Sequence, residues 1–312
     1  MQTAAIIGTG LIGQGWAIVF ARAGWQVRLF DTDQSKLAEA KNLIQQQLYE
    51  LQKHRLLVDA EKIGERVSIA ESLQSAVQGV AYVQENSPEN VEVKKALFAE
   101  LDGLCSLSTI IASSTSSIPA SQFTDHLEHR DRCLVAHPVN PPYLIPVVEI
   151  SGAPWTSNDA VETARRIMLD VGQKPVVVKK EIEGFVLNRL QGALLHEAFR
   201  LVEAGIASAE DIDVTIKDGL GLRWSFMGPF ETIDLNAPGG IADYCTRYAG
   251  FYRSIGDSQE ACVAWEGELL DDLSRQRRAL LDEKDLPARR FWRDEKLMQL
   301  LCHKYGSGET ND

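Results

Sequence analysis

A glycine-rich turn near the N-terminus has the residue types and the spacing that bind a dinucleotide. The apolar run Ala4–Ile7 leads directly into Gly8-Thr9-Gly10-Leu11-Ile12-Gly13, a G-x-G-x-x-G sequence. Gly8 would allow a tight turn, Gly10 would let the backbone approach a pyrophosphate, and Gly13 would let helix and strand pack closely. The diphosphate would lie on the free amides of the following helix, where the helix dipole is positive. The predicted contacts with the cofactor are Gly8, Gly10, Leu11, Ile12 and Gly13.

An acidic residue after the second strand-like run indicates which dinucleotide this is. Asp31 follows Gln26–Phe30 and lies eighteen residues beyond Gly13. Its carboxylate would accept hydrogen bonds from the adenosine ribose hydroxyls, and its charge would repel a 2′-phosphate. The sequence therefore predicts NAD rather than NADP.

Further along the chain, four polar residues could move a proton to and from an alcohol. His137 ends the strand-like run Cys133–His137, and Glu149 lies twelve residues later. Oxidation of a secondary alcohol needs a general base, and histidine commonly supplies it. A carboxylate on the far ring nitrogen would hold one tautomer and stabilise the imidazolium. We predict that His137 is the base and Glu149 its partner, and that Ser116 and Asn188 hydrogen-bond the reacting oxygen.

Each of these residues also has a purely structural interpretation. A histidine before a proline is often a satisfied polar residue, and the Ser/Thr run that contains Ser116 could be an ordinary loop. Asn188 stands where a helix is expected to begin, and asparagine favours the capping position there. The single residues leave both interpretations open.

Composition limits the classes of function. The chain has 312 residues, 45% of them hydrophobic, which is enough for one large or two ordinary domains. The formal net charge of -12 argues against a nucleic-acid partner or an anionic membrane surface, because a polyanion would be repelled over most of the protein.

The cysteines and histidines show no spacing typical of a metal site, so no metal is predicted. The cysteines are odd in number and widely separated, which is typical of thiols in a reducing compartment; they are Cys105, Cys133, Cys245, Cys262 and Cys302. No signal peptide is visible and the apolar runs are shorter than a bilayer span. We expect a cytoplasmic protein without a membrane segment.

The first half of the chain alternates apolar runs with helix-like segments, which is typical of a parallel sheet covered by helices on both faces. From Leu187 onward, apolar residues recur at helical spacing. We therefore predict a doubly wound, mainly parallel α/β domain of the Rossmann type over residues 1–184, followed by an all-α domain over residues 185–312. Strands are expected at 3–8, 26–30, 66–70, 80–84, 109–112, 133–137, 146–150 and 175–178, and later helices at 210–218 and 257–280.

The set Ser116, His137, Glu149 and Asn188, with its spacing, resembles the L-3-hydroxyacyl-CoA dehydrogenase superfamily from residue 3 to about residue 240. Within it, His137–Tyr143 and Gly219–Arg223 are most similar to the lambda-crystallin type, whose enzymatic identity is L-gulonate 3-dehydrogenase. This resemblance implies NAD-dependent oxidation of the 3-hydroxyl of a small L-3-hydroxy acid such as L-gulonate. It also implies a homodimer formed through the helical domain.

The resemblance adds further site residues. Glu89 and Lys94 match an acid–lysine pair near the cofactor ribose, and Asn140 joins the cofactor contacts. Arg223 could hold the substrate carboxylate, since a guanidinium binds a carboxylate in a bidentate manner; it could equally be an ordinary surface or interface arginine. The acyl-CoA enzymes have Asn where this chain has Ser114, so the role of Ser114 stays open.

Three other functions remain possible from the sequence. A 3-hydroxyacyl-CoA dehydrogenase would need cations for the CoA phosphates, and Lys53–Arg66 offers several: Lys53, His54, Arg55, Lys62 and Arg66. A carnitine dehydrogenase shares Gly221–Gly228, and Trp224 could then contact a trimethylammonium group. A crystallin-like structural protein would need no intact active site.

Overall fold

The computed structural model describes residues 2–259 and 264–306. Its contacts divide the chain into two units, the first comprising the residues up to Arg189 together with the segment from Arg290 onward, and the second Leu190–Arg289. The boundary expected at residue 184 lies near this division. The segment after Arg290, expected to belong to the helical domain, groups with the first unit because Met298 is buried in its hydrophobic core.

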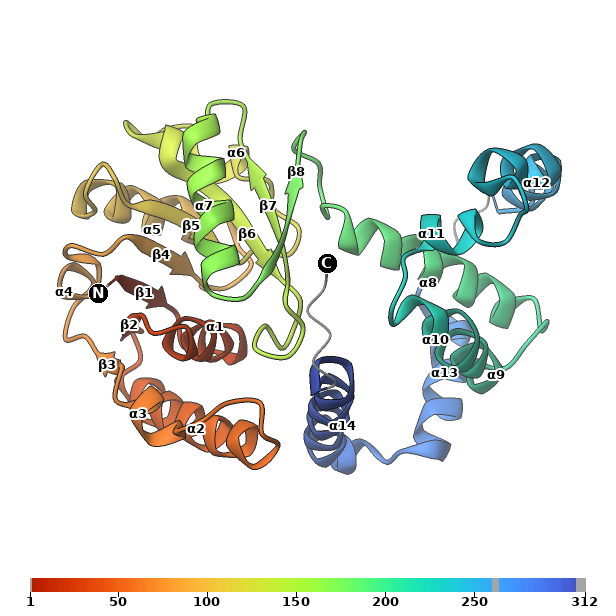
Figure 1. Ribbon diagram of the computed structural model, residues 1–312, viewed down its shortest axis with the longest axis horizontal. Helices are drawn as coiled ribbons and strands as arrows, with labels where there is room; N and C mark the ends of the chain where they lie inside the picture. The colour runs from red at the N-terminus through yellow and green to blue at the C-terminus, as the bar shows by residue number, and fades with distance from the viewer. Residues whose placement is uncertain (1, 260–263, 307–312) are drawn as a thin grey trace. The chain divides into compact units, whose positions relative to one another are not determined.

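The first unit is built on one sheet (Figure 1), in which the described strands follow the order β3-β2-β1-β4-β5-β6-β7-β8. They are β1 (Thr3–Ile7), β2 (Gln26–Phe30), β3 (Val67–Ile69), β4 (Tyr82–Glu85), β5 (Ile110–Ser113), β6 (Cys133–Pro138), β7 (Val147–Gly152) and β8 (Lys174–Val178). The strands up to β6 pair in parallel, whereas β7 is antiparallel to β6 and β8 is parallel to β7. The predicted doubly wound, mainly parallel sheet is confirmed.

Helices cover both faces of this sheet because both faces are apolar. In β1, Ala4 and Ile6 belong to one hydrophobic cluster and Ala5 and Ile7 to another, as the alternation of side chains along a strand requires. The helices of this unit are α1 (Leu11–Arg22), α2 (Gln34–Lys53), α3 (Ala60–Gly64), α4 (Leu73–Val77), α5 (Val91–Leu104), α6 (Ser121–Thr124), η1 (Arg130–Arg132), α7 (Asn158–Asp170) and most of α14 (Leu286–Gly306).

The second unit is helical, as predicted. Its elements are most of α8 (Leu187–Glu203), then α9 (Ala209–Val214), the π-helical η2 (Thr215–Leu220), α10 (Gly221–Trp224), α11 (Pro229–Asp234), α12 (Gly240–Asp257), α13 (Gly267–Leu280) and η3 (Glu283–Asp285). The helix expected at 257–280 is wrong in its first part, since α12 ends at Asp257 and α13 begins at Gly267. Gly267 has a φ of 64°, outside the right-handed helical region, so a single helix cannot run through it.

The strand order places the switch point between β1 and β4, where doubly wound sheets bind ligands beyond the carboxyl ends of their strands. The glycine turn follows β1, Asp31 follows β2, the Ser116 loop follows β5, and His137 lies near the end of β6. The parallel pairing therefore brings these sequence-distant groups to the same edge of the sheet.

Candidate active site

His137 and Glu149 face each other across two antiparallel strands. The register of β6 and β7 pairs His137 directly with Glu149, which explains the spacing of twelve residues. The His137 Nδ1 atom lies 2.9 Å from Glu149 Oε2. The two residues are 6% and 2% exposed, so the contact is largely removed from water. The structure brings together the pair that the sequence predicted.

The other carboxylate oxygen of Glu149 is held by the backbone. The Val186 and Leu187 amides donate hydrogen bonds to Glu149 Oε1 at 2.8 and 2.9 Å. Burial raises the pKa of Glu149, but the His137 hydrogen bond and these two amides lower it by more, so the pKa lies below its ordinary value. A permanent carboxylate fixes the Nδ1–H tautomer of His137 and leaves Nε2 as the acceptor for a substrate proton.

Phe185 is a site residue that the sequence did not indicate. Its buried ring lies 5.6 Å from the His137 imidazole, at an interplanar angle of 39°. Phe185 and Gly184 have φ angles of 50° and 73°, and this left-handed turn aims the next two amides at Glu149. The Gly-Phe pair before a helix was the available signal, but a positive φ at phenylalanine cannot be foreseen from residue type.

Ser116 and Asn188 also meet. Asn188 Nδ2 donates a hydrogen bond of 2.7 Å to the Ser116 carbonyl oxygen. The Ser116 amide and hydroxyl donate to Glu89 Oε1 at 3.0 and 3.3 Å, and Thr115 Oγ1 donates to the same oxygen at 2.6 Å. Burial raises the pKa of Glu89, yet the Thr115 hydroxyl and the charge of Lys94 leave it below its ordinary value. Glu89 therefore holds the loop that carries Ser116.

Lys94 occupies a different place from the one expected for a cofactor contact. Its side chain is 1% exposed, and Nζ lies 3.0 Å from both oxygens of the buried Glu85. The Ser113 hydroxyl donates to the same carboxylate at 2.5 Å. The ammonium group of Lys94 is therefore not exposed at the site, and Lys94 affects the site through the effect of its charge on the pKa of Glu89.

The glycine turn has the shape that a pyrophosphate requires. A Cβ at Gly8 would lie 2.7 Å from the Asn86 carbonyl oxygen, and one at Gly13 would lie 2.0 Å from the Gly8 carbonyl oxygen. At Gly10 a Cβ would meet nothing within 4 Å, so the backbone faces open space. Gly10 caps α1 without a side-chain hydrogen bond, which leaves the first amides of the helix available to an anion. The residues present fit the diphosphate of a dinucleotide.

Asp31 is fixed at the end of β2. Its Oδ2 atom accepts hydrogen bonds from the Thr9 amide and hydroxyl at 2.8 and 3.0 Å, which ties Asp31 to the glycine turn. The residue is half-buried, as a ribose contact would need. Leu11 is exposed and Ile12 half-buried at the start of α1, and Asn140 is exposed on the loop between β6 and β7.

Arg223 belongs to the second unit. It lies in the short helix α10 and is half-buried. A hydrogen bond with Tyr252 raises the pKa of Tyr244, and the nearby charge of Arg223 opposes this rise.

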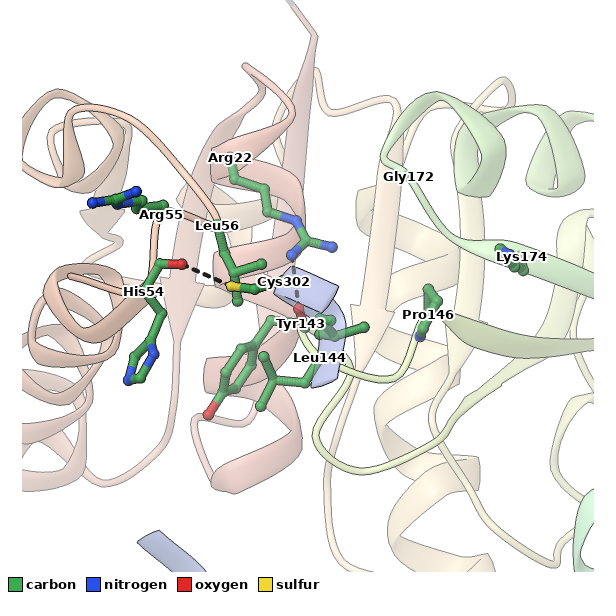
Figure 2. Close-up of a pocket in the computed structure, with 11 residues that line it drawn as sticks. Arg22, His54, Arg55, Leu56, Tyr143, Leu144, Pro146, Gly172, Lys174 and Cys302 are labelled. Carbon is green, nitrogen blue, oxygen red and sulfur yellow. Dashed lines mark hydrogen bonds between the residues drawn. The ribbon is translucent and has the colours of Figure 1, made fainter. Parts of the chain in front are cut away.

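A cavity of about 680 Å³ lies beside the loop that joins His137 to Glu149 (Figure 2). Figure 2 shows the Arg22 side chain directed at the main chain of Tyr143, and Arg22 Nη1 donates to the Tyr143 carbonyl oxygen at 2.7 Å. Arg55 and Lys174 also line the cavity. Of the basic residues proposed from the sequence, His54 and Arg55 line it, whereas Arg66 donates to the Ala21 carbonyl oxygen at 2.7 Å.

The residues that the structure describes form neither a metal-binding cluster nor a membrane-spanning helix. No group of three or more His, Cys, Asp or Glu side chains in that part of the chain could hold a metal ion. None of its helices is long and apolar enough to cross a membrane.

Comparison with known proteins agrees with this geometry. Residues 3–182 match the family model for the 3-hydroxyacyl-CoA dehydrogenase NAD binding domain, and residues 184–266 match the model for its C-terminal domain. The chain is 40% identical to lambda-crystallin of Oryctolagus cuniculus over 300 residues, which is 95% of this chain and 94% of that protein. It is 32% identical to L-carnitine dehydrogenase of a Pseudomonas species over 96% of this chain and 93% of that protein.

A solved structure is similar over nearly the whole chain. It is that of 5-formyl-3-hydroxy-2-methylpyridine 4-carboxylic acid 5-dehydrogenase, described as an NAD⁺-dependent dismutase. The TM-score is 0.82 and the sequence identity 27%, with 99% of this chain and 100% of that chain covered.

Proposed function

Because this chain belongs to the 3-hydroxyacyl-CoA dehydrogenase family, we propose that it oxidises the 3-hydroxyl of a small L-3-hydroxy acid, with L-gulonate as the first candidate. The NAD-binding domain and the oxidoreductase class follow from the family. The choice of substrate is the proposal. It is supported by similarity to lambda-crystallin over 95% of the chain.

The observation that carries the reaction is the buried contact between His137 and Glu149. His137 Nε2 takes the hydroxyl proton, while the Glu149 carboxylate, 2.9 Å from Nδ1, stabilises the imidazolium that forms. When bound, NAD supplies the acceptor for the hydride that leaves the substrate carbon. The Ser116 hydroxyl and the Asn188 amide bind the reacting oxygen and hold it near His137.

The cofactor residues position NAD for this step. Gly8, Gly10, Leu11, Ile12 and Gly13 hold the diphosphate at the start of α1, and Asp31 binds the adenosine ribose. Glu89 binds the other ribose with its remaining carboxylate oxygen, with Lys94 acting through its charge. Asn140, exposed on the loop after β6, completes the set.

A small substrate with its own carboxylate fits two of the similar proteins. Their names refer to carnitine and to a pyridine carboxylic acid, both small carboxylates without a CoA arm. We propose that Arg223 binds this carboxylate. A carnitine-like substrate would use Trp224, which is 41% exposed next to Arg223, to contact its trimethylammonium group.

A second candidate function, 3-hydroxyacyl-CoA dehydrogenation, is favoured by the cavity in Figure 2. Arg22, Arg55 and Lys174 give its lining a positive character, which suits the phosphates of a CoA arm. Tyr143, Leu144 and Pro146 of the loop between His137 and Glu149 line this cavity, so a CoA arm bound there would contact that loop.

We also propose a homodimer formed through the helical unit. Large apolar side chains of this unit are widely exposed, for example Phe226 at 72%, Phe230 at 75% and Phe251 at 61%. Apolar surface on this scale usually marks an interface. Sedimentation at micromolar concentration should give twice the mass of 34.6 kDa, and a single-chain mass would count against the dimer.

A cytoplasmic location is proposed on the chemistry of the thiols. The described cysteines are free, and burial raises the pKa of Cys105 to about 11 and that of Cys133 to about 12, so both stay as thiols. Cys262 lies outside the described residues.

One substrate panel tests the proposed function. Wild type, His137→Ala and the control His126→Ala, which replaces an exposed histidine that is not one of the proposed site residues, are assayed with L-gulonate, 3-hydroxybutyrate, carnitine and acetoacetyl-CoA. We expect NAD-dependent turnover of L-gulonate that falls at least about 10³-fold in His137→Ala and is unchanged in His126→Ala. A preference for acetoacetyl-CoA or for carnitine would show that the substrate is that compound and not L-gulonate. NADH binding without any turnover would favour a crystallin-like structural role.

A further inference from the structure

A network of polar side chains joins the ends of the strands beneath the proposed site. We propose that Ser114 is a positioning residue at the centre of this network, which we call the Ser114 hub: Trp16, Tyr82, Gln84, Asn86 and Ser114. The proposal rests on the proposed function. It answers a point that the sequence left open, namely what Ser114 does where acyl-CoA enzymes have Asn.

The Ser114 hydroxyl has its full set of hydrogen-bond partners. Ser114 Oγ accepts from the indole Nε1 of Trp16 at 3.0 Å and from the Gln84 side-chain amide at 2.7 Å. It donates its own proton to Asn86 Oδ1 at 2.7 Å. Since a hydroxyl has one proton and two lone pairs, these three contacts saturate it. Ser114 therefore has no proton left for substrate or cofactor, and it acts by holding its three neighbours.

Gln84 connects the hub to the base. The side chain is fully buried in β4, and its Oε1 atom accepts from the Tyr82 hydroxyl at 2.7 Å. Besides its bond to Ser114, Gln84 Nε2 donates to the carbonyl oxygen of Ala136 at 3.2 Å. Ala136 directly precedes His137, so this contact fixes the backbone of β6 where the base is attached.

Asn86 connects the hub to the glycine turn. Its side-chain amide donates to the carbonyl oxygens of Ile7 and Gln84 at 3.2 and 2.9 Å. A Cβ at Gly8 would lie 2.7 Å from the main-chain carbonyl oxygen of Asn86, so the Asn86 backbone packs directly against the turn. The hub thus couples three parts of the site, namely the diphosphate turn after β1, the loop that carries Ser116 and the strand end that carries His137.

The size of Ser114 matches its neighbours. Trp16 is fully buried in α1, and both Trp16 and Gln84 reach the short Ser114 side chain at hydrogen-bond distance. The longer side chain of asparagine would need the volume that these two groups fill. Ser114, Trp16 and Gln84 therefore fit one another in size, and their hydrogen bonds keep the reacting groups in position.

The experiment compares Ser114→Ala and Ser114→Thr with a matched structural control, Thr109→Val. Thr109 is fully buried before β5, at the opposite edge of the sheet, and its hydroxyl donates to the Val80 carbonyl oxygen at 2.7 Å. Ser114→Ala removes the three hydrogen bonds of the Ser114 hydroxyl and Thr109→Val removes one, and only the first substitution disturbs the site. The measurements are kcat, both KM values, the deuterium isotope effect at the substrate carbon, NADH affinity and the melting temperature.

For Ser114→Ala we expect kcat to fall about tenfold and NADH to bind about fivefold more weakly, since small misplacements of reacting groups cost up to about a hundredfold. The isotope effect should rise because the hydride step becomes slower. Ser114→Thr keeps the hydroxyl and should regain most of the activity. Thr109→Val should lower the melting temperature with kcat unchanged. A Ser114→Ala enzyme with the kcat, isotope effect and NADH affinity of Thr109→Val would overturn the proposal.

Trp16→Phe keeps the test decisive if Ser114→Ala does not fold. It removes one donor from the hub and should lower kcat about threefold, and in combination with Ser114→Ala the losses should be less than multiplicative. If wild type turns over none of the substrates, the proposed function fails. NADH affinity then decides the hub alone, because weakening in Ser114→Ala but not in Thr109→Val supports it and equal affinity refutes it.

Discussion

Replacing Glu149 by glutamine tests how the base is held. In the structure, Glu149 Oε1 accepts two backbone amides and Oε2 contacts His137 Nδ1. The glutamine carbonyl must face the two amides at Val186 and Leu187, because an NH₂ group there would oppose two donors. The NH₂ group of the new side chain therefore faces His137, and Nδ1 has to become the acceptor.

This orientation sets the magnitude of the effect. A hydrogen bond to a charged group contributes about 1.5–3 kcal/mol, so losing the bond to the imidazolium alone costs about ten- to a hundredfold in rate. The change of tautomer adds to this loss, because the proton moves to His137 Nε2, the atom that must receive the substrate proton. The same exchange in the serine-protease triad lowers kcat about 10⁴-fold, so we expect a loss between about 10² and 10⁴.

The assay is steady-state oxidation of the preferred hydroxy acid by wild type, Glu149→Gln and Glu162→Gln. Glu162 is an exposed acid on α7 whose partner is Arg165, and it controls for the loss of one negative charge. NADH binding by Glu149→Gln should stay within about twofold of wild type, since the substituted group holds a base rather than the cofactor. A Glu149→Gln enzyme that keeps kcat within about threefold of wild type would refute this account of the base.

Five further outcomes follow from the structure. The pKa of Glu149 is lower in the folded protein than in the unfolded chain, so the ionised carboxylate stabilises the fold. This stabilisation is complete above about pH 4.3 and is lost as the pH falls through the pKa of the folded protein. The urea midpoints of wild type and Glu149→Gln should therefore converge at low pH. Gly10→Ala should leave the melting temperature unchanged and weaken NADH binding about tenfold or more, because its methyl group meets no protein atom but occupies the diphosphate surface. Gly13→Ala should instead destabilise the fold by about 3 kcal/mol or more, measured by urea unfolding, since the added carbon lies 2.0 Å from a backbone oxygen. Asp31→Ala should lower the NAD-to-NADP preference in kcat/KM about a hundredfold, and an unaltered preference would refute the role of Asp31. Arg223→Ala should raise KM for L-gulonate about tenfold or more with NADH affinity unchanged, and an unaltered KM would refute the role of Arg223.

Tertiary contacts changed the interpretation of several single residues. Lys94 was expected at the cofactor surface, and its ammonium group lies instead on the buried Glu85. Ser114 looked like one member of a serine-rich loop, and three partners, Trp16 of α1, Gln84 of β4 and Asn86 just after β4, make it the centre of a partly buried network. The contacts of Ser114 join residues separated by 28 to 98 positions, and no local pattern records them.

By itself, the sequence determined the glycine turn with Asp31, the alternation that builds a parallel sheet, and the twelve-residue interval between His137 and Glu149. These features are local or periodic, because backbone freedom at glycine and the repeat of a strand are properties of short segments. Only the tertiary structure decided that the Phe185 turn supplies two amides to Glu149, that Glu89 holds the Ser116 loop, and that the last helix joins the first unit. Those outcomes depend on which distant segments pack together, and packing is decided by the burial of the whole chain rather than by any one stretch of it.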